Sequence, residues 1–93
     1  MKIIYTDRFV YEIWAIADFI ALDSWARAEA FVENAEKLCE SLVDMPYKCR
    51  KSFKFDDENV RDLIYKGYVI PYLVESECIS ILGIYKENAW EFE

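Results

Sequence analysis

The sequence predicts an α+β fold in which a helical hairpin packs on one face of a small, twisted antiparallel sheet. Two patterns in the chain lead to this prediction. Residues 9–42 carry apolar side chains at the spacing of amphipathic helices, interrupted once by a turn. Residues 60–85 instead alternate with a period of two, and short polar segments divide them into three runs. With a first β-rich run at residues 2–6, the expected order is β-α-α-β-β-β, and we expect residues 1–93 to form one domain.

The two predicted helices are separated by a very short turn, so they must pack antiparallel. The first has a wide apolar stripe over residues 9–21, and Thr6 or Asp7 can cap its start. Asp23 and Ser24 then supply a new N-cap, and the second helix must stop before Pro46, because the residue before a proline disfavours helix. Three aromatic residues of the helices can lie in the core or at its edge: Trp14, Phe19 and Trp25. Aromatic side chains of such helices more often lie in a core than stack on a ligand.

The C-terminal half predicts three antiparallel strands joined by two hairpins: "VRDLIY" (60–65), "YVIPYLV" (68–74) and "CISILGIY" (78–85). Gly67 permits the positive φ that the first tight turn needs. Pro71 lies in the middle strand, where its missing N–H would leave a carbonyl unpaired. We therefore expect Pro71 either at a bulge or with its nitrogen directed where no ladder bond forms. The segment "SFKF" (52–55) is a candidate short edge strand.

The composition excludes several classes of site. The net charge is -7, which argues against non-specific nucleic-acid binding, although residues 46–66 carry a net +2 and the rest therefore -9. That segment is either an ordinary solvated loop or a basic patch on an acidic body. The chain has no histidine and three cysteines without CxxC spacing, so we expect no disulfide framework, no metal centre and no cofactor. Cys39 and Cys78 fall in apolar patterns and are expected in the core.

No apolar run resembles a signal peptide or approaches the length of a membrane span, so a cytoplasmic protein without membrane contact is expected.

Two long segments carry a family resemblance: "FVYEIWAIADFIALDSWARAEAFVENAEKLCESLVDMP" (9–46) and "ENVRDLIYKGYVIPYLVESECISILGIYK" (58–86). Their order and spacing resemble the RelE/ParE superfamily of toxins of bacterial type II toxin–antitoxin modules, often labelled plasmid-stabilisation proteins. The likeness covers roughly residues 2–86. Its most specific elements are "LVDMP" (42–46), Arg61-x-Leu63 and Tyr65-x-Gly67-Tyr68-x-Ile70-x-Tyr72.

The resemblance implies a cytoplasmic protein that inhibits growth when free and that a cognate antitoxin holds inactive. It also implies two target classes. RelE-like members are ribosome-dependent endoribonucleases that cut mRNA, whereas ParE-like members poison DNA gyrase without known nuclease chemistry. A homodimer is a further possibility that exposed apolar side chains would allow.

If the chain is RelE-like, the catalytic candidates are Lys51, Lys54 and Arg61. RNA cleavage requires proton transfer at two oxygens and stabilisation of the phosphorane charge, and Lys and Arg can supply these in place of His. The alternative role of Arg61 is a structural ion pair with an acidic helix residue or with the antitoxin. Tyr85 or Trp90 can stack on a base or cover the sheet.

Several residues depart from the RelE-like pattern. Val69 stands where family members commonly have arginine, and Cys49 stands where many have glycine. The end of the chain, "YKENAWEFE", has only Lys86 as a basic residue, while Glu87 and Glu91 would repel phosphate there. Together with the acidic net charge, these departures favour a ParE-like inhibitor of a protein target such as gyrase. A ribosome-dependent endoribonuclease and a non-toxic, antitoxin-binding relative remain the alternatives.

Overall fold

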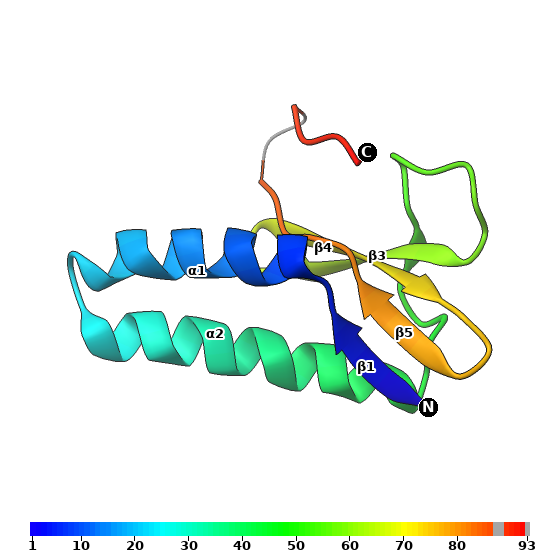
Figure 1. Ribbon diagram of the computed structural model, residues 1–93, viewed down its shortest axis with the longest axis horizontal. Coiled ribbons are helices and arrows are strands. Elements are labelled where there is room, and N and C mark those ends of the chain that lie inside the picture. The colour runs from blue at the N-terminus through cyan, green and yellow to red at the C-terminus, as the bar shows by residue number, and fades with distance from the viewer. Residues whose placement is uncertain (87–88, 93) are drawn as a thin grey trace.

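The computed structural model describes residues 1–86 and 89–92, and it has two layers, a helical hairpin and a five-stranded sheet (Figure 1). The elements are β1 (Lys2–Tyr5), α1 (Asp7–Ala21), α2 (Trp25–Glu40), the 3₁₀ turn η1 (Ser41–Val43), β2 (Arg50–Lys51), β3 (Val60–Tyr65), β4 (Tyr68–Val74) and β5 (Cys78–Ile81). The strand order is β1-β5-β4-β3-β2. The predicted α+β class, with its helical hairpin on a small sheet, is confirmed.

Both helices begin at the predicted caps. The Thr6 hydroxyl accepts a hydrogen bond from the Phe9 amide at 3.2 Å, and it donates to the Ile81 carbonyl at 2.7 Å. One side chain therefore starts α1 and fastens it to the end of β5. Ser24 caps α2 in the same way, through the Arg27 amide at 3.2 Å. After α2 the chain passes into η1 and leaves helical structure before Pro46, as predicted.

The sheet differs from the prediction in three places, one of which is that the last strand, expected over residues 78–85, ends at Ile81. β3, β4 and β5 are antiparallel as expected, but β1 pairs with β5 in parallel, so the sheet is mixed. Parallel pairing brings the end of β1 beside the end of β5, where the Thr6 amide donates to the Ile81 carbonyl at 3.2 Å. The edge strand is β2 at residues 50–51 instead of residues 52–55, because the chain turns away from β3 after the Ser52 amide bonds the Val60 carbonyl.

Pro71 lies opposite a bulge, which is one of the two arrangements expected for it. Its carbonyl accepts from the Leu82 amide at 2.9 Å, so the position of its missing N–H also faces that neighbouring segment. Two residues further back along β4, Val69 exchanges hydrogen bonds of 2.7 and 3.0 Å with Tyr85. The two-residue interval from Val69 to Pro71 on β4 thus lies opposite the three-residue interval from Leu82 to Tyr85. The extra residue in the second interval forms the bulge. The register break places the segment after β5 against the sheet without a regular ladder.

The preceding turn uses the conformation that the sequence predicted. Gly67 has φ +84°, and Lys66 also has a positive φ, of +49°. Two consecutive left-handed residues are the requirement of the tight hairpin turn whose twist matches its strands.

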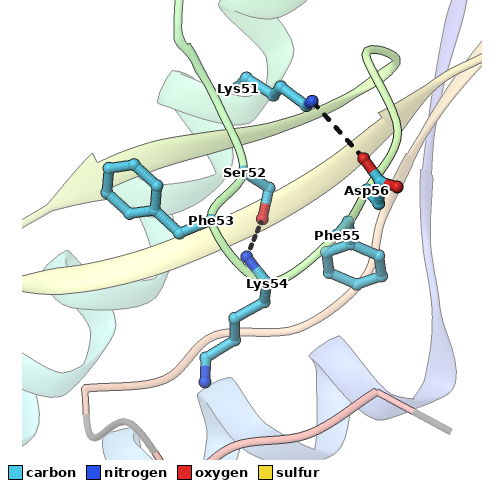
Figure 2. A pocket seen from close by; sticks show the side chains of 6 residues that line it. All are labelled: Lys51, Ser52, Phe53, Lys54, Phe55 and Asp56. Atoms are coloured by element: carbon cyan, nitrogen blue, oxygen red, sulfur yellow. Dashed lines mark hydrogen bonds and ion pairs between the residues drawn. The ribbon is translucent and has the colours of Figure 1, made fainter.

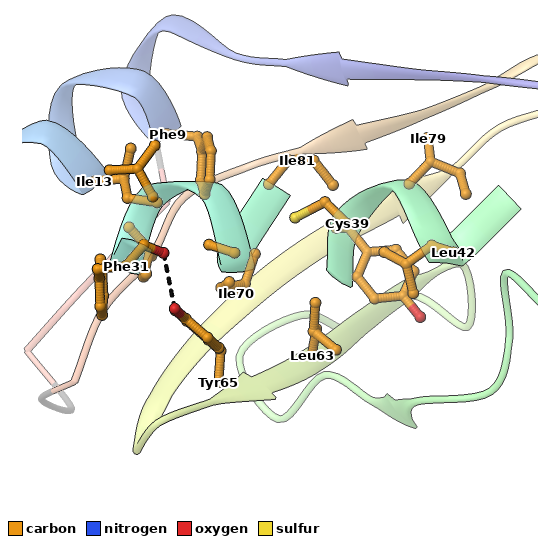
Figure 3. Close-up of a cluster of buried hydrophobic side chains, with 14 of the residues drawn as sticks. Phe9, Ile13, Phe31, Cys39, Leu42, Leu63, Tyr65, Ile70, Ile79 and Ile81 are labelled. Atoms are coloured by element: carbon orange, nitrogen blue, oxygen red, sulfur yellow. Dashed lines mark hydrogen bonds between the residues drawn. The ribbon is translucent and has the colours of Figure 1, made fainter. Parts of the chain in front are cut away.

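The core fills the space between the helices and the inner face of the sheet (Figure 3). Two buried tyrosines direct their hydroxyls to backbone carbonyls, Tyr65 to Phe31 and Tyr72 to Pro46, both at 2.8 Å. Cys39 is fully buried as expected, whereas Cys78 is partly exposed. The aromatic residues of the helices, for which a core position was favoured over ligand stacking, are exposed: Trp14, Phe19 and Trp25. The turn end of the hairpin projects beyond the sheet (Figure 1), so side chains near it, such as those of Phe19 and Trp25, have no second layer to cover them. Trp14 lies in the middle of α1 and outside its buried stripe.

Burial of Cys39 predicts a loss of stability in alkali. Burial first, and then the charges of Glu40 and Glu36, raise the pKa of the Cys39 thiol from 9.0 to about 12. The folded state therefore holds a proton that the unfolded state has lost between these values. Stability should be unaffected by this thiol below about pH 9 and should fall by up to about 1.4 kcal/mol per pH unit as the pH rises toward 12.

Urea unfolding of Cys39→Ala between pH 7 and pH 11 should show a shallower loss of stability than the wild type. Part of the slope should remain, because burial also raises the pKa of the Tyr5 and Tyr72 hydroxyls. Val32→Ala, a core truncation without a titrating group, should lower stability equally at each pH. Identical slopes for Cys39→Ala and wild type would contradict the prediction.

Candidate functional site

Two of the predicted basic residues, Lys51 and Arg61, are neighbours on the β2–β3 edge. They face each other in the strand register. The carboxylate of Glu58 lies between them, with Oε1 at 3.5 Å from the Lys51 ammonium and Oε2 at 3.7 Å from the Arg61 guanidinium. Lys51 also pairs with Asp56 at 3.9 Å (Figure 2). Both cations therefore have carboxylate partners from their own loop.

Arg61 is the most firmly held of the predicted residues. Its guanidinium donates to the Glu58 carbonyl at 3.0 Å and to the Cys49 carbonyl at 3.2 Å, and it lies 5.0 Å from the centre of the Tyr47 ring. These contacts close the loop of residues 47–58 on β3. The ion-pair partner is thus a loop glutamate, not an acidic residue of a helix. Cys49 contributes its backbone carbonyl to this arrangement.

Lys54 belongs to a different surface. Figure 2 shows its side chain extending away from Lys51 toward the C-terminal segment. Its ammonium lies 5.3 Å from the centre of the Tyr85 ring. Tyr85 pairs with Val69, whose side chain is on the opposite face of β4 from the buried Ile70. We call this face, turned away from the helices, the outer face. Arg61, in register with the buried Tyr72, belongs to the inner face, so the three predicted residues do not converge.

The outer face holds a buried carboxylate that sequence reasoning missed. Asp62 has a side chain only 1% exposed, and neither oxygen accepts a hydrogen bond from the part of the chain that the structure describes. The Arg50 guanidinium lies 3.6 Å away and also covers the ring of Phe53 at 4.4 Å. Burial, followed by the nearby Asp62 charge, raises the pKa of the Tyr85 hydroxyl. The available signal was strand alternation, which places Asp62 opposite Pro71 on an otherwise apolar face.

The C-terminal segment is fastened to α1 by one carboxylate. Glu12 Oε1 accepts from the Ile84 amide at 3.1 Å, and Oε2 accepts from the Trp90 indole at 2.8 Å and from Arg8 Nε at 3.3 Å. A Cβ on Gly83 would lie 2.6 Å from Glu12 Oε1 and 2.7 Å from the Trp90 ring. Glycine is therefore needed at position 83 for this close approach.

The aromatic rings of this segment engage each other and two cations. Trp90 and Tyr85 are stacked, with ring centres 4.8 Å apart and an interplanar angle of 14°. The Arg8 guanidinium lies 4.2 Å from the centre of the Trp90 ring, as Lys54 lies over Tyr85. Trp90 is 9% exposed, so it covers the outer face, which is the second of the two roles considered for it.

A hollow of about 490 Å³ lies beside this stack, between the loop after β2 and the C-terminal residues. It is lined by Lys54, Phe55, Trp90, Glu91 and Phe92. Glu91, which was expected to repel phosphate, therefore lies beside Lys54, while Glu87 lies outside the described residues.

Within residues 1–86 and 89–92, no cluster of three or more His, Cys, Asp or Glu side chains is arranged to hold a metal ion. Over the same residues, neither helix has the length and apolar character that crossing a membrane requires.

Comparisons with known proteins point to one family. The sequence model of a family described as "ParE toxin of type II toxin-antitoxin system, parDE" matches residues 3–88. A solved structure described as "Chromosomal ParDE TA system from P. aeruginosa" contains a chain with 21% identity and a TM-score of 0.72, over 90% of this chain and 92% of that chain. At this identity the structural likeness establishes the shared fold. No curated protein matches the sequence.

The close approach of Glu12 and Trp90 to Gly83 predicts that a side chain at position 83 would displace the C-terminal segment. Gly83→Ala should displace Trp90 from Glu12 and lower stability by about 1–3 kcal/mol, because the added methyl group overfills the site. Trp14 and Trp25 are exposed. In a background with both replaced by Phe, acrylamide should quench Trp90 fluorescence more strongly in Gly83→Ala.

Gly67→Ala is the matched control, because the nearest atom to its added methyl group is Lys86 Cε at 3.9 Å. It should cost about 1 kcal/mol through backbone strain at positive φ and leave the quenching of Trp90 unchanged. Equal quenching in the two alanine variants would show that Gly83 does not hold Trp90 in place.

Proposed function

Since this chain belongs to the family of ParE toxins of type II toxin–antitoxin systems, we propose that it inhibits growth by binding a protein target, DNA gyrase, and not by cutting RNA. Membership makes the chain a toxin component, and such a toxin has an antitoxin as its partner. The target is the part that is proposed. We further propose that residues 1–93 act as one domain in the bacterial cytoplasm, where gyrase is found.

The position of Glu58 is the observation that carries the proposal. A nuclease of the Lys/Arg type needs several cations directed at one phosphate oxygen. Here one glutamate pairs with Lys51 and Arg61 together, and Arg61 is also bonded to two backbone carbonyls. A phosphate approaching these cations would meet the carboxylates of Glu58 and Asp56. Lys54 extends from the loop after β2, away from Lys51 and toward the C-terminal segment (Figure 2), so it cannot complete the same group without rearrangement.

The rings of Tyr85 and Trp90 favour the same proposal. Base recognition by stacking requires an accessible ring face. Trp90 is already engaged by Tyr85 and Arg8, and Tyr85 by Trp90 and Lys54. Neither ring presents an unoccupied platform for a nucleotide.

A ribosome-dependent endoribonuclease is the second candidate. The pairs of Lys51 with Glu58 and Asp56 involve exposed side chains and are individually weak. A ribosomal partner could therefore break them and free the lysine. A relative that binds an antitoxin without toxicity is the third candidate, and absence of growth arrest on expression would identify it. A homodimer stays a prediction.

Expression of Lys51→Ala separates the first two candidates. For a gyrase inhibitor, this variant should arrest bacterial growth as well as the wild type does, within about threefold, because the lysine is paired inside its own loop. Arrested cells should keep intact transcripts and show a DNA-damage response, and the purified protein should inhibit supercoiling by gyrase.

Lys48→Ala, which removes another lysine of the same loop, is the matched control. For a nuclease that uses Lys51 in proton transfer, Lys51→Ala alone should lose roughly 10²-fold or more of its activity. Transcripts cut in wild-type cells and intact in Lys51→Ala cells would reject the proposal in favour of the endoribonuclease.

A further inference from the structure

α1 is largely apolar on the side that faces solvent as well as on the side that faces the core. The buried side is formed by Phe9, Ile13 and Ala17. On the opposite side, exposed residues follow one another three or four positions apart: Tyr11, Trp14, Asp18 and Leu22. A surface helix normally carries polar residues there, whereas a helix that is apolar all round is normally covered on both sides. The described residues leave this second side of α1 uncovered.

The exposed side of α2 is polar instead. Its glutamates recur at the same helical spacing and are exposed: Glu29, Glu33, Glu36 and Glu40. Lys37 lines a hollow together with the last three of them. Within the part of the chain that the structure describes, none of these four carboxylates takes part in an ion pair. Solvent is a suitable cover for α2, so the apolar exposed side is specific to α1.

Net charge limits the sides through which two copies of the chain can associate. Each copy carries -7, which opposes association wherever carboxylates would meet, as they would between two α2 helices. Among the exposed residues from Val10 to Leu22, Asp18 is the charged one, and Asp7 stands at the helix start. The other charges at the margins are paired: Arg8 with Glu12 and Arg27 with Asp23. α1 therefore lets a second copy approach with far less repulsion than α2 does.

An antiparallel arrangement of two α1 helices gives Asp18 a partner. A two-fold axis between positions 14 and 15 aligns the two helices over positions 7 to 22, and the same side of each copy meets the other. Tyr11 of each copy then lies opposite Asp18 of the other, and its hydroxyl can donate a hydrogen bond to that carboxylate. Within residues 1–86 and 89–92, neither side chain has a hydrogen bond or an ion pair of its own. The contact can therefore form twice without breaking another.

Two neighbouring residues fit the same arrangement. Ala15 lies beside the axis, and a small residue there lets the helices approach to about 8–10 Å. Lys86 lines a hollow of about 590 Å³ with Tyr11 and Ala15, so Asp18 of the second copy would arrive near its ammonium group. Glu12 lines this hollow too, but its carboxylate already accepts three hydrogen bonds, from Arg8, the Ile84 amide and the Trp90 indole.

The exposed apolar area of α1 is sufficient for a dimer. Tyr11 is 78% exposed, Trp14 49%, Leu22 85% and Val10 41%. A whole aromatic side chain covers about 150–250 Å², so the exposed parts of the two rings come to roughly 250 Å². Val10 and Leu22 bring the total to roughly 400 Å², the size of a functional patch on a monomer. Because about 60% of an interface is apolar, this corresponds to about 1,300 Å² over both copies, in the lower range of specific interfaces.

We propose that the side of α1 defined by Val10, Tyr11, Trp14, Asp18 and Leu22 is the interface of a two-fold symmetric homodimer. In it, α1 packs antiparallel on α1 of a second copy, and Tyr11 donates to Asp18 across the interface. An apolar helix of the antitoxin is the other occupant that this side can accept. The second copy is favoured because α1 itself supplies the matching apolar row, with donor and acceptor in the positions that the two-fold axis exchanges. This inference does not depend on the proposed target.

The test is sedimentation equilibrium of the purified chain. Over about 1 to 200 µM, the wild type should pass from monomer to dimer with a micromolar Kd. Trp14→Glu should raise that Kd at least about tenfold, because it removes an aromatic anchor and places two carboxylates beside the axis. Phe53→Glu is the matched control, since Phe53 is an exposed aromatic residue of the loop after β2. It should dimerise within about threefold of the wild type.

A double-mutant cycle tests the antiparallel register. Tyr11→Phe should raise the dimer Kd by about tenfold, because each Asp18 carboxylate loses its donor inside the interface. In an Asp18→Ala background the same change should alter the Kd by no more than about twofold, since the partner is already absent. Equal effects in the two backgrounds would overturn the register. Unchanged thermal unfolding of the monomeric variants would show that weaker association does not arise from misfolding.

Three results would overturn the α1 interface. The first is a wild type that stays monomeric over the whole concentration range. The second is a dimer that Trp14→Glu leaves intact, which would place the contact on another surface. The third is a loss of association in Phe53→Glu equal to that in Trp14→Glu, which would show that the added charge acts without regard to position. If the wild type is monomeric and Trp14→Glu no longer binds the antitoxin, the antitoxin is the occupant. None of these results bears on gyrase inhibition, which is measured separately.

Discussion

The carboxylate of Glu12 connects the two halves of the fold. By accepting from the Ile84 amide and the Trp90 indole, it holds the chain that follows β5 against α1. The same carboxylate accepts from Arg8, so the guanidinium is positioned over the Trp90 ring. Gly83 has to lack a side chain for this contact to form. Without it, Trp90 would not cover the outer face, and the hollow beside Phe55 and Phe92 would lose its floor.

The irregularity of β4 supports the same arrangement. A proline in a central strand removes one ladder donor, which is tolerated where the neighbouring strand departs from regular pairing. The extra residue between Leu82 and Tyr85 supplies that departure and turns Tyr85 toward Val69. Tyr85 then stacks on Trp90, and the Lys54 ammonium lies over the Tyr85 ring. The missing N–H of Pro71 and the shape of the outer face are thus parts of one local structure.

Neighbouring carboxylates limit the binding roles that are open to the basic residues of this toxin. Glu58 occupies Lys51 and Arg61, and Asp62 lies beneath Arg50. In these pairs the cation is held by the chain itself, which limits its use as a binding group for phosphate. The resemblance placed Lys51 and Lys54 in a loop and Arg61 on a strand; Arg61 lies on β3 and Lys54 in the loop after β2, whereas Lys51 lies in β2 itself. It did not locate their partners, because ion pairs within a loop depend on how that loop folds back.

The sequence by itself determined the elements whose signals are local. Thr6 and Ser24 cap helices through their own neighbouring amides, Lys66 and Gly67 make their turn, and the alternation of residues 60–74 places the inner face of the hairpin. Pro71 indicated either a bulge or a nitrogen directed where no ladder bond forms, because a missing N–H has a local consequence wherever the strand pairs. Only the tertiary structure decided the parallel pairing of β1, the exposure of Trp14, Phe19 and Trp25, the separation of Lys54 from Arg61, and the burial of Asp62. Each of these depends on segments far apart in the chain meeting in space, and helical or strand periodicity specifies which side of an element is apolar but not what will cover it.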